Sequence, residues 1–267
     1  MENNIYKKNK ERGIPPQLVN MLIAGIILLL LFLARESLTA FILSVITIGK
    51  KYSSYFITGL LITLGLSAIA VIIGTIIGSL IYFLRSSKSK FISFLAVSFV
   101  EMIRGTPLIT QLFIVFFGAA LVFDYKALGI SISNAAFLAG VIAVSINSGA
   151  YISEIIRSGI QSIDKGQIEA GRSVGMSTVM TMKEIVIPQA IKNILPALGN
   201  EFIAVIKETS IASSIGVTDI MYNVNLVRGN SFKSMEPLII AAVLYFVITF
   251  TLSRLVRILE RKLKESD

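Results

Sequence analysis

The sequence predicts an all-α, polytopic membrane protein, and two observations support this fold class. First, 54% of the 267 residues are hydrophobic and 15% are charged, with a mean hydropathy of +0.79, which excludes an ordinary water-facing surface. Second, the chain contains apolar runs long enough to cross about 30 Å of hydrocarbon as helices. We therefore expect a bundle of transmembrane helices.

Six runs are predicted to be spans, in chain order 18–34, 54–84, 91–122, 135–156, 194–215 and 237–256. The first follows a basic tail, as a secretory signal peptide would, but no small-x-small cleavage site follows it and the chain stays apolar to Ile48, so we interpret it as an uncleaved anchor. The second and third are too long for one upright span, so tilt, kinks or protruding ends are expected. Within the second, Gly74 and Gly78 predict close helix packing, inside the subunit or across a dimer.

Lysine and arginine are distributed unevenly between the two sides that six spans imply. With the amino terminus inside, the inner segments carry 17 of these residues and the outer segments, which include 35–51, carry 6. The positive-inside rule therefore predicts that both termini and the long segment 159–190 are cytoplasmic. The net charge of +9 then reflects basic inner loops beside anionic lipid, and we expect no nucleic-acid partner.

Several residue types needed for catalysis are missing. Cysteine and histidine are absent, which excludes disulfides, thiolate or imidazole metal sites, cysteine nucleophiles and the Ser-His-Asp triad. The phosphate-binding pattern Gly-x-x-x-x-Gly-Lys-Ser/Thr is also absent, so the chain is not expected to hydrolyse ATP. We expect no catalytic residue, no metal and no cofactor on this chain.

Charged residues fall inside the predicted spans, where they cost about 2.5–3.5 kcal/mol to insert and usually face a partner or a water-filled path. Glu101 and Arg104 are three residues apart, as are Glu154 and Arg157, so each pair can be neutralised on one helical face. This structural pairing is an alternative to a role in transport.

Uncharged polar residues at mid-depth indicate where a substrate could pass. Thr106 precedes a proline that would kink the third span and free a carbonyl, and Asn147 and Ser148 lie at the centre of the fourth. We predict a path lined by Thr106, Asn147 and Ser148, with Glu154 or Glu208 as the partner of a substrate amino group. Helix packing and interhelical hydrogen bonding are open alternatives for these residues.

A polar, sparsely charged segment at 167–188 stands apart from the apolar runs. Helix formers and apolar residues predict a short surface helix over 167–182, broken at Gly175 and stopped before Pro188. Met176, Met180 and Met182 would give this helix an adaptable apolar face for a partner. From the pattern alone, an amphipathic helix lying on the membrane surface is the alternative.

The same segment matches, in spacing, the pattern Glu-Ala-Ala, three residues, Gly, nine residues, Ile-x-Leu-Pro. The matching residues are Glu169, Ala170, Gly171 for the second alanine, Gly175, Ile185, Ile187 for the leucine, and Pro188. The segment therefore resembles the cytoplasmic coupling loop of ABC importer permeases. The resemblance implies that these positions, with Met176, contact a separate ATPase, and Glu169 is expected to cap the start of the loop helix.

Three further segments, 101–111, 148–157 and 206–212, resemble the subfamily that imports polar amino acids such as histidine, glutamine, arginine and lysine. The resemblance covers about four-fifths of the chain. It implies the five-helix core of a type I importer permease over 53–267, with the coupling loop at 159–190. Residues 1–52 would add a basic cytoplasmic tail, an extra transmembrane helix and an outer loop.

The resemblance also implies partners and a location. These are two copies of an ABC ATPase that hold ATP and Mg, an extracytoplasmic substrate-binding protein, a second permease subunit, identical or different, and a polar or basic amino acid, in a bacterial or archaeal cytoplasmic membrane. The competing function is a secondary amino acid transporter driven by an ion gradient, with Glu101, Glu154 or Glu208 as ion sites. The two halves show no inverted repeat that would favour it.

Overall fold

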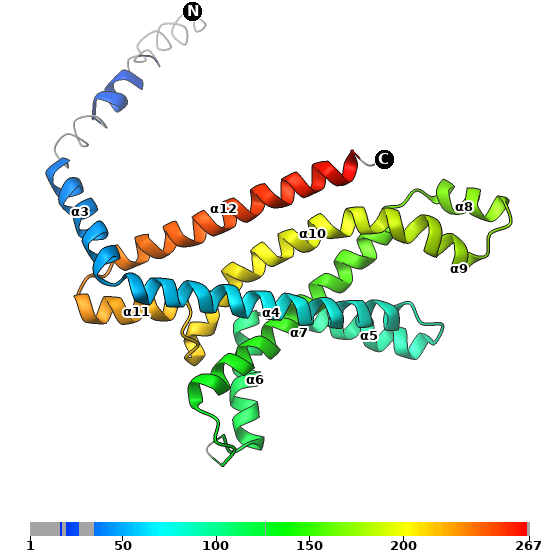
Figure 1. The fold of residues 1–267 in the computed structure, drawn as a ribbon, viewed down its shortest axis with the longest axis horizontal. Coiled ribbons are helices and arrows are strands. Elements are labelled where there is room, and N and C mark those ends of the chain that lie inside the picture. Colours follow the sequence, from blue (N-terminus) through cyan, green and yellow to red (C-terminus); the bar gives the residue numbers. More distant parts are fainter. Residues whose placement is uncertain (1–16, 18–19, 27–34, 126, 266–267) are drawn as a thin grey trace, which may run out of the picture.

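The computed structural model describes residues 17, 20–26, 35–125 and 127–265, and the regular structure within these residues is helical. Most of the predicted first span, 18–34, lies outside them. The helices, labelled as in Figure 1, are α3 (Arg35–Lys51), α4 (Ser53–Arg85), α5 (Lys90–Arg104), α6 (Leu108–Val122), α7 (Ile132–Gln161), α8 (Lys165–Ser173), α9 (Thr178–Thr181), the π-helix η1 (Met182–Val186), α10 (Ile187–Glu208), the 3₁₀-helix η2 (Thr209–Ile215), α11 (Ile220–Ser231) and α12 (Glu236–Lys264).

Three helices of the described chain are long and apolar enough to cross a membrane: α4, α7 and α12 over Glu236–Leu263. A fourth span results if α5 and α6 are counted as one broken span. Helix α10 is not among them, because Asn193, Asn200 and Glu201 interrupt its apolar residues. The helical fold class is confirmed, whereas the predicted number of spans is not.

The predicted third span is a pair of helices bent by 104°. Helix α5 ends at Gly105, and Pro107 is the N-cap of α6 with an extended backbone, φ −63° and ψ 138°. Proline has no N–H to continue the ladder and disfavours helical backbone at the residue before it, so the chain turns here. The predicted kink is confirmed at this position, and the pair forms either one broken span or a re-entrant loop.

Helix α7 lies at the centre of the molecule and packs along α4. Small residues make the close approach: a Cβ on Gly78 would lie 2.7 Å from the carbonyl oxygen of Gly149, and one on Gly74 would lie 3.2 Å from Gly149 N. The Gly74–Gly78 face is therefore a helix contact within the subunit, as one of the two predicted alternatives required.

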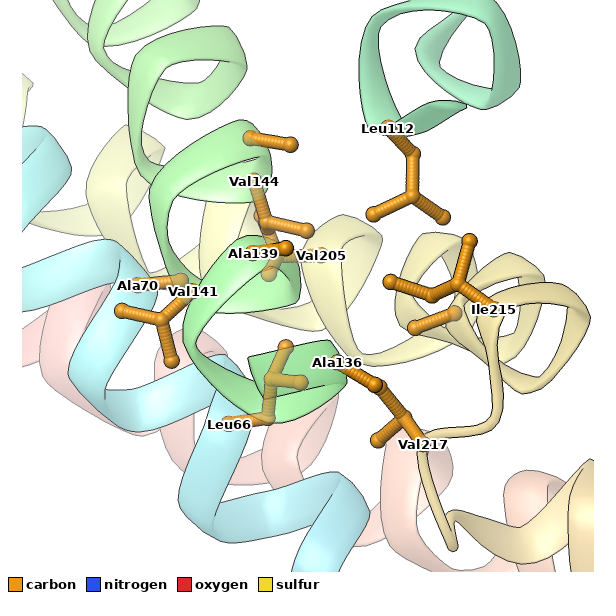
Figure 2. Close-up of a cluster of buried hydrophobic side chains, with 12 residues drawn as sticks. Leu66, Ala70, Leu112, Ala136, Ala139, Val141, Val144, Val205, Ile215 and Val217 are labelled. Carbon is orange, nitrogen blue, oxygen red and sulfur yellow. The ribbon is translucent and has the colours of Figure 1, made fainter. Parts of the chain in front are cut away.

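The main apolar core forms where α4, α6, α7, α10 and η2 meet. Figure 2 shows side chains from these elements directed at one another, among them Leu66, Leu112, Val144, Val205 and Ile215. Alanines on α7 fill the narrow space between the larger side chains. This core fixes α7 against the helices that surround it.

The predicted fifth span, 194–215, begins earlier and ends differently. Helix α10 starts at Ile187, and the last seven residues, Thr209–Ile215, form the 3₁₀-helix η2. Hydroxyl groups here bond carbonyl oxygens three residues back: Thr209 to Ile206, Ser210 to Lys207, Ser213 to Ser210 and Ser214 to Ile211. Such local bonds compete with the α-helical ladder and suit the tighter turn.

Residues 35–51, predicted as an outer loop, form helix α3 instead. One face of α3 packs on α12: Ile48 is buried, and the hydroxyl of Ser44 donates a 2.9 Å hydrogen bond to the Glu236 carboxylate. The loop prediction was wrong because Arg35, Lys50 and Lys51 were taken as marks of a loop. They lie at the ends of a helix, where charges remain accessible to water.

Figure 1 shows how the ends of the helices are distributed along the long axis. Helices α8 and α9, the end of α12 and the connection between α4 and α5 lie toward one end. Helix α11 and the junction of α3 with α4 lie toward the other. Three segments predicted to share one side of the membrane therefore lie at the same end of the fold.

Candidate functional site

The predicted coupling segment is a helix, a sharp break and a second helix. The break is at Gly175, whose φ of +88° is a left-handed conformation that favours glycine. Gly175 N–H donates to the Arg172 carbonyl and Met176 N–H to the Gly171 carbonyl, both at 3.1 Å. This pair of bonds is a Schellman motif, which satisfies the last carbonyls of α8. The predicted break is confirmed.

The start of α8 differs from the prediction. Asp164 is the N-cap, and its side chain accepts a 2.7 Å hydrogen bond from Gly166 N–H. Glu169 lies in the middle of α8 with an exposed side chain, so its predicted capping role is wrong. Ser177 caps α9 in the same manner, accepting from Met180 N–H at 3.2 Å.

Gly171 and Ile185 hold the two helices of the segment together. A Cβ on Gly171 would lie 2.9 Å from Ile185 Cδ1 and 3.0 Å from Thr181 Cγ2, and Gly171 is buried. A side chain larger than a methyl group therefore has no room between α8 and the helix that follows. These two residues shape the segment from inside and contribute little to its outer surface.

The outer surface of the segment is apolar, although the predicted three-methionine face does not form. Val174 is 79% exposed, Val179 77% and Met180 53%. Met176 is half-buried, and Met182 packs against the buried cluster of Ile163, Val186 and Ala190. The turn at Gly175 changes the phase of the helix, which the assumption of one periodic helix ignored. We call Val174, Val179 and Met180, with the exposed Glu169 and Ala170, the coupling surface.

Helical structure does not stop before Pro188, contrary to the prediction. Helix α9 continues through η1 into α10, and Pro188 lies in the first turn of α10. Proline cannot donate to a carbonyl of the preceding turn, and the wider π turn accommodates it. The side-chain amide of Gln189 donates to the Ile185 carbonyl at 3.0 Å, one turn back along the helix. The coupling surface is thus joined to α10 by continuous helix.

Two predicted path residues, Thr106 and Asn147, are linked through Gln111. Asn147 Nδ2 donates to Gln111 Oε1 at 3.0 Å, and Gln111 Nε2 donates to the Thr106 hydroxyl at 2.8 Å. Gln111 Nε2 also donates to the Ile103 carbonyl, at 2.7 Å, across the break between α5 and α6. Gln111 was missed, although it ends the segment 101–111 that the sequence analysis singled out.

Ser148, the next path residue, faces a carboxylate that was not predicted. Its hydroxyl donates a 3.2 Å hydrogen bond to Glu201 Oε1 on α10. Glu208, which was predicted, is exposed and lies seven residues further along α10, about two turns away on the same face. A carboxylate inside an apolar run was the signal for Glu201, and attention to the denser cluster at 207–210 obscured it.

Glu154 pairs with two arginines. Arg157 Nη2 lies 2.6 Å from Glu154 Oε2, as predicted, and Arg85 at the end of α4 pairs with the other oxygen. Both oxygens of Glu154 are therefore engaged, and it joins α4 to α7. The analogous pair of Glu101 with Arg104 does not form within the described residues, since Arg104 lies over the Tyr151 ring, 5.2 Å from its centroid.

Comparisons with known proteins find relatives that match most of the chain. The family model of binding-protein-dependent transport system inner membrane components matches residues 70–265. A putative glutamine transport system permease protein of Rickettsia typhi is 40% identical over 209 residues, 78% of this chain and 93% of that protein. An arginine transport system permease protein of Bacillus subtilis is 40% identical over 213 residues, 80% of this chain and 94% of that protein.

Solved structures share the fold. The crystal structure of an amino acid ABC transporter with histidines has 47% identity and a TM-score of 0.73, over 79% of this chain and 95% of that chain. An inward-facing methionine ABC transporter has 18% identity and a TM-score of 0.59, over 77% of this chain and 96% of that chain, a likeness of fold alone.

Proposed function

This chain belongs to the family of binding-protein-dependent transport system inner membrane components. From this premise we propose that it couples to an ATPase through the coupling surface and carries polar amino acids. The chain is a permease subunit of an amino acid ABC transport system, and it works with an ATPase and a substrate-binding protein. It is a multi-pass membrane protein and not itself an enzyme. In our proposal two ATPase copies bind ATP and Mg, and a second permease subunit, identical or different, completes the transporter.

The coupling surface is the proposed contact with the ATPase. Val174, Val179 and Met180 present apolar side chains outside the predicted spans, where lipid tails do not cover them. An exposed apolar patch rimmed by polar residues is typical of a protein interface. The Schellman turn and the buried Gly171 hold this patch in one shape.

The proposed substrate path runs past the polar groups where α6, α7 and α10 face one another. The observation that carries it is the Ser148–Glu201 hydrogen bond beside the Thr106–Gln111–Asn147 chain. A carboxylate supplies a partner for the substrate ammonium group, and the amide groups supply donors and acceptors for its polar side chain. We therefore assign Glu201, with Glu208, the amino-group role, while Glu154 serves to join helices.

Polar amino acids are the proposed substrates, and arginine and glutamine are the first to test, since relatives are named for their transport. The test is uptake of labelled arginine, histidine and glutamine into proteoliposomes that contain the chain, its ATPase and its binding protein. ATP-dependent uptake is expected. Uptake that needs no ATPase and collapses with an ionophore would instead establish the secondary transporter.

A further inference from the structure

An apolar groove lies between α4, α7, η1 and α10, apart from both the polar path and the coupling surface. Its walls include Phe83 of α4, Ile156 and Ile160 of α7, Met182 of η1, and Ile187 and Ile191 of α10. Its volume is about 260 Å³. The groove therefore adjoins the helical link between the coupling surface and α10.

The lining excludes the transported amino acid as an occupant. Ser79 and Tyr82 are the polar side chains among the lining residues, and the Ser79 hydroxyl already donates to the Thr75 carbonyl at 2.8 Å. An amino acid buried here would leave its ammonium and carboxylate groups without ionic partners, at a large desolvation cost. A hydrocarbon chain has no such requirement.

The surroundings of the groove indicate where the hydrocarbon comes from. Two apolar lining residues are well exposed, Phe83 at 70% and Ile191 at 45%, and Leu80, next to the lining residue Ser79 on α4, is 58% exposed. In a chain that spans a membrane, such a surface contacts lipid. The groove is thus continuous with the lipid-facing side of α4 and α10.

Basic residues lie close in sequence to residues that line the groove. Lys183 directly follows the lining residue Met182, has a side chain 79% exposed and is paired at 3.7 Å with its neighbour Glu184. The exposed Lys88 and Lys90 follow the end of α4, close in sequence to Phe83, whereas Arg85, the last residue of α4, is paired with Glu154. Cations beside lipid-facing apolar surface attract anionic headgroups.

We propose that this groove binds an acyl chain of an anionic phospholipid, with the headgroup beside Lys183. We place this lipid in the cytoplasmic leaflet. That placement rests on the proposed function, because the groove adjoins the segment that we place at the ATPase. The bound chain contacts Met182, where the π-helix begins, so the lipid stabilises the link through which the coupling surface moves α10.

The absence of tryptophan from the sequence makes a direct test practical. A single reporter, Phe83→Trp, is placed in the groove, and Phe94→Trp serves as the matched control. Phe94 is 65% exposed, lies near the start of α5 and does not line the groove. The full-length chain is reconstituted in bilayers with increasing fractions of brominated phosphatidylglycerol or brominated phosphatidylcholine, and the quenching of fluorescence is measured.

We expect brominated phosphatidylglycerol to quench Phe83→Trp well above the level that its fraction in the bilayer would give at random. Quenching of Phe94→Trp should rise in proportion to that fraction. Adding Ser79→Leu, which fills the groove, should return Phe83→Trp to the control curve, and Lys183→Gln should reduce the preference for phosphatidylglycerol. Equal quenching of the two reporters would overturn the proposal. Weaker quenching of Phe83→Trp than of the control would overturn it in favour of a second permease copy covering the groove.

This readout needs no ATPase, binding protein or substrate. A failure of transport in proteoliposomes would therefore leave the quenching result intact, and a failure of quenching would leave the transport function intact.

Discussion

Gly175 shows how one backbone angle determines what the coupling surface presents. Its positive φ allows the Schellman turn, and the turn sets the relative orientation of α8 and α9. A Cβ on Gly175 would meet nothing within 4 Å, so the constraint comes from the backbone and not from crowding. A non-glycine residue in this conformation costs roughly 1–2 kcal/mol.

We expect Gly175→Leu to abolish co-purification of the ATPase and ATP-dependent uptake while membrane insertion stays normal. Gly175→Asn should retain most of both, because asparagine tolerates left-handed backbone. Gly229→Leu is the control, since Gly229 also has open space around it but lacks the positive φ. Normal ATPase binding by Gly175→Leu would show that this segment is not the coupling contact.

At the proposed path, Glu201→Gln preserves the size of the side chain and removes its charge. A hydrogen bond between the Glu201 carboxylate and the substrate ammonium group is worth about 1.5–3 kcal/mol. Its loss should lower uptake at low substrate concentration roughly tenfold or more. The loss should be larger for arginine than for glutamine. Binding of the ATPase should not change, and uptake equal to that of the unaltered chain would return Glu201 to a packing role.

At the scale of elements, the contact between α4 and α7 depends on glycine. We expect Gly78→Ala to destabilise the protein by about 1–3 kcal/mol, because the added methyl group would overlap the Gly149 carbonyl and Ile152. Gly65→Ala on the same helix meets nothing within 4 Å and should be neutral or slightly stabilising. Thermal unfolding of the two variants in detergent measures the difference, and equal melting temperatures would contradict the close contact.

Helix α3 provides a second test at this scale. Removing residues 1–34 should leave the contact of α3 with α12 in place, whereas removing 1–51 deletes it. Ser44→Ala removes the bond to Glu236, worth about 1 kcal/mol, and should lower the melting temperature by about 2–4 °C. If removal of 1–51 has no effect on thermal stability, the packing of α3 is unimportant to the fold.

The sequence predicted long apolar helices well, because hydropathy acts over a whole segment. Helices α4, α7 and α12 lie where the apolar runs place them, and Pro107 marks the break between α5 and α6. The ends of helices and the contacts between them were predicted less well. The ends of α10 depend on hydroxyl-to-carbonyl bonds, and the partners of Ser148 and Asn147 lie on other helices, so their spacing in the sequence carries no signal.

At the scale of the whole molecule, the distribution of basic residues predicts which segments face the cytoplasm. The inner segments carry most of the lysine and arginine, and the segments at 86–89 and 162–186 lie toward the same end as the end of α12. Reporters fused after Lys90, Lys192 and Asp267 should therefore be cytoplasmic, and reporters after Tyr125 and Arg228 should face outward. A single reporter on the wrong side would break this arrangement.

The uninterrupted helix from Thr178 through η1 to Glu201 has the properties of a lever arm. At about 1.5 Å per residue it is roughly 35 Å long, so each degree of tilt displaces its far end by about 0.6 Å. A few degrees imposed at the coupling surface would move the Glu201 carboxylate by more than the tolerance of a hydrogen bond and separate it from Ser148. Closure of the ATPase could then release an amino acid without any helix having to unfold.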